Sequence, residues 1–181
     1  MSLVLNGSGS ITGLSAGGLP DGSVTADDLA SSLDLSGKTV TLPSGTGGKV
    51  LQVVSMNTNT STQVSASSHV DTAITLLITP SSASSKILIL SSTDIQSTAN
   101  DTHGGLRLLR GATILKDFGT LLNTNSAAMS IYTHSFSYLD SPTTTSSTTY
   151  KLQVVRTGAS GTIEVNAYSR YSTFTLMEIA A

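Results

Sequence analysis

This chain of 181 residues has no cysteine and no tryptophan, and only 11% of its residues are charged, against the usual ~25%. The absence of cysteine excludes disulfides, thiolate catalysis and cysteine-type zinc sites. The nine Lys and Arg are scattered and the net charge is −2, so no basic stripe is present to bind nucleic acid. No apolar run approaches the ~20 residues that cross a bilayer, so we expect no membrane insertion.

The first residues of the chain also lack the pattern of a secretory signal. Residues 1–6 have neither the basic region nor the apolar stretch of a secretory signal. We therefore expect synthesis in the cytoplasm of the producing cell.

Hydroxyl side chains are what the chain has in excess. It contains 31 Ser and 27 Thr, many of them between short β-branched runs. Apolar residues still make up 38% of the chain, which is enough to predict a folded core. A composition so poor in titratable groups suits a rigid surface module better than an enzyme, and we expect no cofactor.

The sequence divides near residues 43–48, which we interpret as a hinge. Residues 1–42 form an arm with seven of the sixteen Gly and with repeated turn signals. The arm is too short and too interrupted to bury its own apolar groups. We therefore predict that it attaches to another surface through its apolar residues, which are Leu3, Val4, Leu5, Ile11, Leu14 and Leu19.

One stretch of the arm, residues 25–33, can form a short helix. Thr25 is a candidate N-cap, and two Asp in the first turn suit the helix dipole. Leu29 and Leu33 are four residues apart, a stripe too narrow to stabilise a lone helix. Two interpretations stay open: three copies meet around an axis through Leu29 and Leu33, or the segment is a solvated helical turn.

Residues 49–181 read as strand after strand. The runs of apolar or alternating residues lie at 49–55, 73–79, 86–92, 105–110, 112–118, 130–139, 149–156, 161–169 and 172–179. In residues 130–139 the alternation puts Tyr132, His134, Phe136 and Tyr138 on one face. About nine antiparallel strands in this length predict an all-β fold, a jelly-roll-like β-sandwich head.

The predicted core is modest, because only three Phe and no Trp are present. Many predicted strand faces carry Thr and Ser instead. Such a sandwich gains stability if one face is buried against copies of itself, so we predict an oligomer.

Catalytic patterns are weak throughout the chain. Outside the arm the seven carboxylates are isolated in sequence, and no metal-binding His spacing or Gly-x-Ser-x-Gly turn occurs. His103 lies in a polar segment that indicates either a loop-tip contact or ion ligand, or a hydrophilic turn. Tyr168, Arg170 and Tyr171 form the densest aromatic cluster. They indicate either a surface recognition site or a corner between strands with buried rings.

Three segments carry a family resemblance: residues 11–30 (ITGLSAGGLPDGSVTADDLA), 78–89 (ITPSSASSKILI) and 175–179 (TLMEI). The first resembles a linker of virion fibre and decoration proteins of tailed bacteriophages, and the other two resemble the C-terminal head of these proteins. The matches touch about a third of the chain. The resemblance implies a homotrimeric β-sandwich head on a virion, with the N-terminal arm as attachment device, and it carries over no catalytic residue.

The chain has no long shaft ahead of its head, unlike a typical tail fibre. The resemblance and this shortness favour a capsid decoration (cement) protein on the capsid exterior, with the major capsid protein as partner. The alternative is a short tail fibre or lectin-like head that binds host surface polysaccharide. An enzyme that acts on glycans is the least favoured hypothesis, because the carboxylates are scattered.

Overall fold

The computed structural model describes residues 4–5, 11–12, 49–124 and 129–181. Contacts between Cα atoms divide the chain into two units, Met1–Ser44 and Gly45–Ala181. In the first unit β1 (Val4–Leu5) pairs antiparallel with β2 (Ile11–Thr12). The other arm residues for which we predicted attachment or trimer contacts, Leu3, Leu14, Leu19, Leu29 and Leu33, lie outside the described residues, as does the predicted helix at 25–33.

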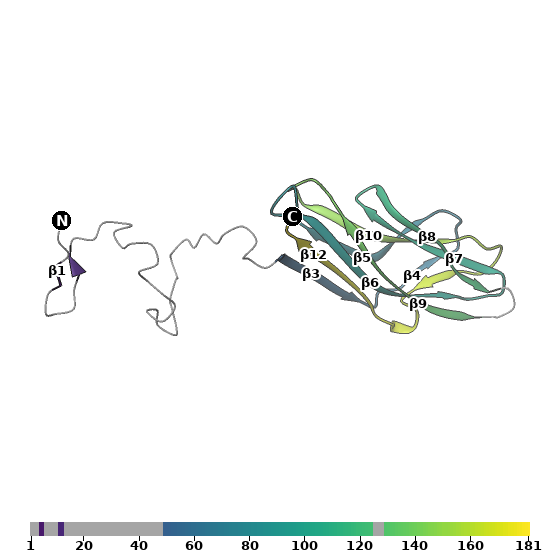
Figure 1. The fold of residues 1–181 in the computed structure, drawn as a ribbon. Helices are drawn as coiled ribbons and strands as arrows, with labels where there is room; N and C mark the ends of the chain where they lie inside the picture. The colour runs from purple at the N-terminus through teal and green to yellow at the C-terminus, as the bar shows by residue number, and fades with distance from the viewer. Residues whose placement is uncertain (1–3, 6–10, 13–48, 125–128) are drawn as a thin grey trace. The chain divides into compact units, whose positions relative to one another are not determined.

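The second unit is a sandwich of two antiparallel sheets (Figure 1). One sheet has the order β5-β10-β7-β8, and the other has the order β3-β12-β6-β11-β4, with β9 on the free side of β6. The strands are β3 (Val50–Thr58), β4 (Thr62–Val64), β5 (Val70–Ile78), β6 (Lys86–Ser97), β7 (Thr102–Arg110), β8 (Thr113–Thr124), β9 (Ser130–Asp140), β10 (Thr148–Arg156), β11 (Ile163–Val165) and β12 (Ser172–Ile179).

The connectivity of the eight long strands is that of a jelly roll. The first pairs with the last (β3 with β12), the second with the seventh (β5 with β10), the third with the sixth (β6 with β9) and the fourth with the fifth (β7 with β8). Nested pairing of this kind folds one long antiparallel ribbon into two facing sheets. The predicted all-β, jelly-roll-like sandwich is therefore confirmed.

Branched aliphatic side chains from both sheets fill the space between them. Ile74, Leu106 and Leu152 come from one sheet, and Ile89 and Leu176 come from the other. Two large aromatic residues, Tyr150 and Phe174, are also fully buried. Each buried aliphatic side chain contributes about 1.5–3 kcal/mol to folding. The core thus rests on Val, Ile and Leu, as the composition predicts.

The aromatic face predicted for residues 130–139 is the inner face of β9. The ring of Phe118 on β8 lies 4.8 Å from that of His134 and 4.5 Å from that of Phe136, centroid to centroid. This cluster packs between the edge strands of the two sheets. Burial lowers the pKa of His134, because an apolar surrounding disfavours the charged imidazolium.

Several strands are longer than predicted; β6 and β8, predicted at 86–92 and 112–118, extend to Ser97 and Thr124. Residues 167–169 belong to a short 3-10 helix, η2 (Ala167–Ser169), so the run predicted at 161–169 is a strand only over β11. The predictions also missed β4, because three residues are too few to show a periodicity. No helix in the described part of the chain is long and apolar enough to cross a membrane.

Two adjacent glycines let the backbone approach closely on β7. A Cβ at Gly105 would overlap the carbonyl oxygen of Gly119, where β8 passes with a register shift. A Cβ at Gly104 would lie 2.6 Å from Cγ1 of Ile163 in the other sheet. Glycine is required where another backbone or side chain comes this near. The pair draws β8 and β11 tightly against β7.

Candidate functional site

The turn between β11 and β12 presents the two most exposed aromatic side chains of the described residues. Tyr168 is 71% exposed and Tyr171 is 61% exposed, with Arg170 between them. We call residues 166–171 the tyrosine turn. The interpretation of a corner with buried rings is therefore wrong, and the tyrosines are accessible to a partner.

The backbone of the tyrosine turn has an unusual conformation. Asn166, Tyr168 and Ser169 have φ angles of 58°, 54° and 56°. Residues other than glycine seldom adopt this left-handed region, which costs of order 1 kcal/mol each. Such conformations persist only where the surrounding structure holds them, and they cluster at ligand-binding segments.

Asn166 supplies much of the support for this conformation. Its side chain is buried, and its amide nitrogen donates hydrogen bonds to the carbonyl oxygens of Thr58 (3.2 Å) and Thr60 (3.1 Å). The hydroxyl of Ser172 donates to its amide oxygen. One side chain thus ties the turn to the end of β3 and to the start of β12, and the two tyrosines project from a fixed base.

Arg170 is held by a carboxylate of the neighbouring strand. Its guanidinium lies 3.3 Å from Asp94 on β6, and the hydroxyl of Thr133 on β9 donates a hydrogen bond to the same carboxylate. The hydroxyl of Tyr168 contacts the sulfur of Met129 at 3.4 Å. Asp94 thus holds the guanidinium of Arg170, and Met129 contacts the hydroxyl end of Tyr168. Tyrosine and arginine on a rigid base are the side chains that dominate many binding interfaces.

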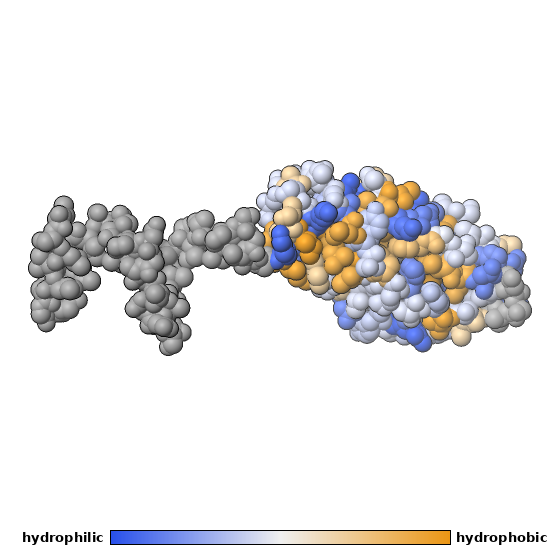
Figure 2. Space-filling model, viewed as in Figure 1, coloured by the Kyte–Doolittle hydropathy of each residue, from blue (hydrophilic) through white to orange (hydrophobic). Residues whose placement is uncertain are grey.

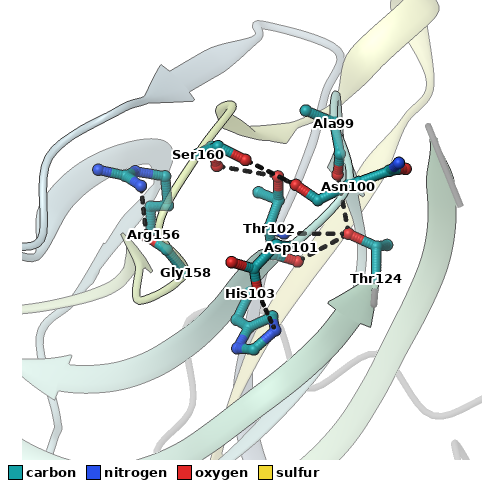
Figure 3. Close-up of polar contacts among 9 residues, drawn as sticks. All are labelled: Ala99, Asn100, Asp101, Thr102, His103, Thr124, Arg156, Gly158 and Ser160. Carbon is teal, nitrogen blue, oxygen red and sulfur yellow. Dashed lines mark hydrogen bonds and ion pairs between the residues drawn. The ribbon is translucent and has the colours of Figure 1, made fainter. Parts of the chain in front are cut away.

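A second group of polar residues braces the loops between β6 and β7 and between β10 and β11 (Figure 3). The hydroxyl of Thr102 donates to the carbonyl oxygen of Ser160 at 2.9 Å, and that of Ser160 donates to the carbonyl oxygen of Asn100 at 2.6 Å. The hydroxyl of Thr124 donates to the carbonyl oxygen of Ala99 at 2.9 Å. Hydrogen bonds from hydroxyl groups, rather than ion pairs, thus hold these loops together.

His103 lies beside this group rather than at a loop tip. It is the second residue of β7, and its ring lies 3.5 Å from the carboxylate of Asp101 (Figure 3). The loop therefore ends at Asp101, two residues before the histidine. His103 belongs to the sheet opposite to the one that carries the tyrosine turn. The structure thus brings Tyr168, Arg170 and Tyr171 together and leaves His103 apart.

The least exposed carboxylates of the sandwich are engaged within the fold. Asp94 binds Arg170, Asp140 binds Arg110 and Tyr150, and Glu178 accepts hydrogen bonds from Gln52 and Ser81. Among the residues that the structure describes, no group of three or more His, Asp or Glu could hold a metal ion. The geometry of the site suits binding by rigid aromatic and guanidinium groups.

Sequence reasoning missed Asn166 and Asp94, the residues that position the site. An asparagine tolerates the left-handed conformation better than most residues, and this was a usable signal at Asn166. Asp94 gives no signal, because its partner Arg170 is far away in sequence. Only the pairing of β6 with its neighbours brings the two together.

No protein-family model and no curated protein matches this chain. Two similar solved structures come from a virus. One is the structure of the infectious bursal disease virus Gx strain, with a TM-score of 0.40 and 12% identity over 79% of this chain and 41% of that one. The other is the infectious bursal disease virus VP2 subviral particle, with a TM-score of 0.35 and 14% identity over 85% of this chain and 46% of that one. This chain spans less than half the length of either, and similarity at this level assigns it no function.

Proposed function

We propose that this protein is a structural protein of a tailed-phage virion. In this proposal it is a homotrimeric decoration (cement) protein that binds and reinforces the outer capsid surface. Residues 1–42 are the arm that binds the major capsid protein, and the sandwich is the exposed head.

The observation that carries this proposal is that the two ends of the sandwich differ: the chain enters at one end, and the tyrosine turn lies at the other. The chain enters β3 at Lys49, and the backbone nitrogen of Ala180 donates to the carbonyl oxygen of Lys49 at 2.7 Å, so entry and C-terminus share one end (Figure 1). The tyrosine turn lies beyond the other ends of β3 and β12, because Ser172 pairs with Thr58. A head joined at one end can therefore present the opposite end away from an attachment surface.

The fold and the composition are compatible with this role. Jelly rolls occur in viral capsid and lectin domains, although a fold alone does not imply a function. Three weak arms on one rigid trimer bind far more tightly than one arm, because the second and third contacts form within the same complex. An arm that covers about 1,000 Å² of capsid surface would suffice for specific attachment.

Deletion of residues 1–18 is expected to abolish binding to particles that lack the protein, while the head stays folded. The reason is that the deleted segment holds most of the apolar residues proposed to contact the capsid. The measurement is co-sedimentation of purified protein with particles, with far-UV circular dichroism as the folding control. A truncated protein that still decorates particles would disprove the role of the arm.

A second candidate function is receptor binding by a short tail fibre or lectin-like head, and the tyrosine turn favours it. Replacement of Tyr168 and Tyr171 by alanine is expected to weaken adsorption of the isolated protein to host cells at least about tenfold, since such anchors carry much of a binding energy. The matched control is Ile114→Ala, at an exposed residue of β8 in the other sheet. Equal adsorption of all three proteins would remove this candidate.

Location on the particle separates the two functions. Gold-labelled antibody on purified particles, viewed by electron microscopy, is expected to mark the capsid. Label confined to the tail would contradict capsid decoration and support receptor binding.

A further inference from the structure

The outer face of the sheet that contains β3, β12, β6 and β9 carries an apolar row across all four strands. Met177 of β12 pairs with Val53 of β3 on one side and with Leu88 of β6 on the other, and Leu88 pairs with Leu139 of β9. Paired residues on neighbouring strands point to the same face. The four side chains therefore form one continuous row, which we call the apolar row.

The apolar row is open to solvent at its two ends, Val53 and Leu139, is partly buried at Met177 and Leu88, and is extended at the start of β3. Val53 is 54% exposed and Leu139 is 52% exposed, and Val50 and Leu51 are exposed beside them. Figure 2 shows hydrophobic residues gathered over the start of β3, where the chain enters the sandwich. Scattered exposed apolar residues need no explanation, but a contiguous patch marks an interaction surface.

The edge of this sheet is also unprotected. In the described chain β3 pairs with β12 alone, and its sequence VLQVVSMNT has no charged residue and no proline. Proteins usually block such edges with charge, proline or a covering segment. An apolar, uncharged edge strand beside an apolar row is expected to be covered by another chain.

Charge indicates which chain covers it. The outward-facing side chains of the four strands include two ionised groups, Lys86 at one corner and Asp94, which is paired with Arg170. The outer face of the other sheet is different, since Asp71 there binds Lys151 and Gln153 binds Arg107. A face with so little charge can meet an identical face without like-charge repulsion, whereas a foreign partner of opposite charge would find little to recognise.

The size of the face is sufficient for such a contact. Four strands about 4.8 Å apart and about eight residues at 3.3 Å each give about 500 Å² per copy. Two copies would bury about 1,000 Å², near the lower limit for a specific interface. Beside the apolar row an open groove of about 600 Å³, with Leu90 and the hydroxyls of Ser92, Ser135, Ser137, Thr173 and Thr175, can accept side chains of the partner.

We propose that this outer face binds a second copy of this chain. The apolar row and the edge of β3 form the contact, and the hydroxyl groove lies within it. The inference deepens the proposed function by naming a surface between copies of this chain, and it does not depend on whether the assembly is the proposed homotrimer.

Replacement of both Val53 and Leu139 by lysine is the test. Both side chains are more than half exposed in one chain, so the fold is expected to tolerate the change. Wild-type full-length protein is expected to sediment as an oligomer at micromolar concentration. The double variant is expected to dissociate at least about 100-fold more readily, because the contact would then bury unpaired charges. Analytical ultracentrifugation over a dilution series measures both, and thermal unfolding confirms the fold.

The matched control is Leu77→Lys, since Leu77 is 56% exposed on the outer face of β5 in the other sheet. This variant is expected to keep the wild-type oligomer. A monomeric wild type would overturn the inference, including the case in which residues 1–48 cover the face, and so would a double variant that stays assembled. An oligomer that fails to bind particles would leave this inference standing and would overturn the proposed function instead.

Discussion

Replacement of Asp140 by alanine is expected to lower the free energy of unfolding by about 3 kcal/mol. The Asp140 carboxylate is almost fully buried, and Arg110 donates to its two oxygens at 3.0 and 2.7 Å. The hydroxyl of Tyr150 donates to it at 2.7 Å, and burial together with this hydrogen bond raises the pKa of Tyr150. Removal of the carboxylate leaves a guanidinium and a buried hydroxyl without their acceptor, which costs about 3–5 kcal/mol where both charges are buried. Urea denaturation at pH 7 measures the loss.

Asp71 provides a control of the same residue type with an ion pair of the same length. It pairs with Lys151 at 2.7 Å, the distance found between Asp140 and Arg110, but its side chain is 55% exposed. Asp71→Ala is therefore expected to cost less than about 1 kcal/mol. Equal losses for the two variants would contradict the role assigned to burial.

Acid is expected to destabilise the sandwich strongly through Glu178. Burial by itself raises the pKa of this carboxyl, but hydrogen bonds from the side chain of Gln52 and from the side chain and backbone of Ser81 outweigh it and lower the pKa from 4.5 to about 2. The carboxylate form is thus favoured in the folded state. Its contribution is fully present above pH 4.5 and is lost as the pH falls toward 2, and a shift of this size corresponds to about 3 kcal/mol.

Glu178→Gln isolates this contribution. The variant is expected to be less stable than the wild type at pH 7, and the difference is expected to shrink as the pH falls from 4.5 to 2. Gln52→Ala, which removes one donor and keeps the carboxyl, is expected to retain part of the acid dependence. Urea denaturation at several pH values measures both. A constant difference between wild type and Glu178→Gln over this range would show that the carboxylate does not provide the stabilisation.

The long strands were predictable because each carries its own periodicity. Along β9 the alternation predicts that Tyr132, His134, Phe136 and Tyr138 share a face, and the register with β6 confirms it. A two-residue period determines the facing of side chains wherever one side of a sheet is buried. The core of Val, Ile and Leu could be predicted from composition, because the chain has only three Phe and no Trp.

The residues of the candidate site could be predicted from the sequence, but the exposure of their side chains could not. Tyr168, Arg170 and Tyr171 are adjacent in sequence, so their grouping needed no fold. Their exposure depends on Asn166, whose partners Thr58 and Thr60 are more than 100 positions away. A local pattern contains no information about such contacts, because the pairing of β3 with β12 creates them.

The sequence by itself determined the class of this protein: an all-β, weakly charged module with a core of branched aliphatic residues. Local periodicity and the low share of charged residues are sufficient for that. Only the tertiary structure decided which strands are neighbours, which carboxylates are buried, and which face is left apolar. The nested pairing places Val53, Met177, Leu88 and Leu139 in one row. These residues come from four distant segments, and no local signal relates them, because their proximity results from long-range hydrogen bonding between strands.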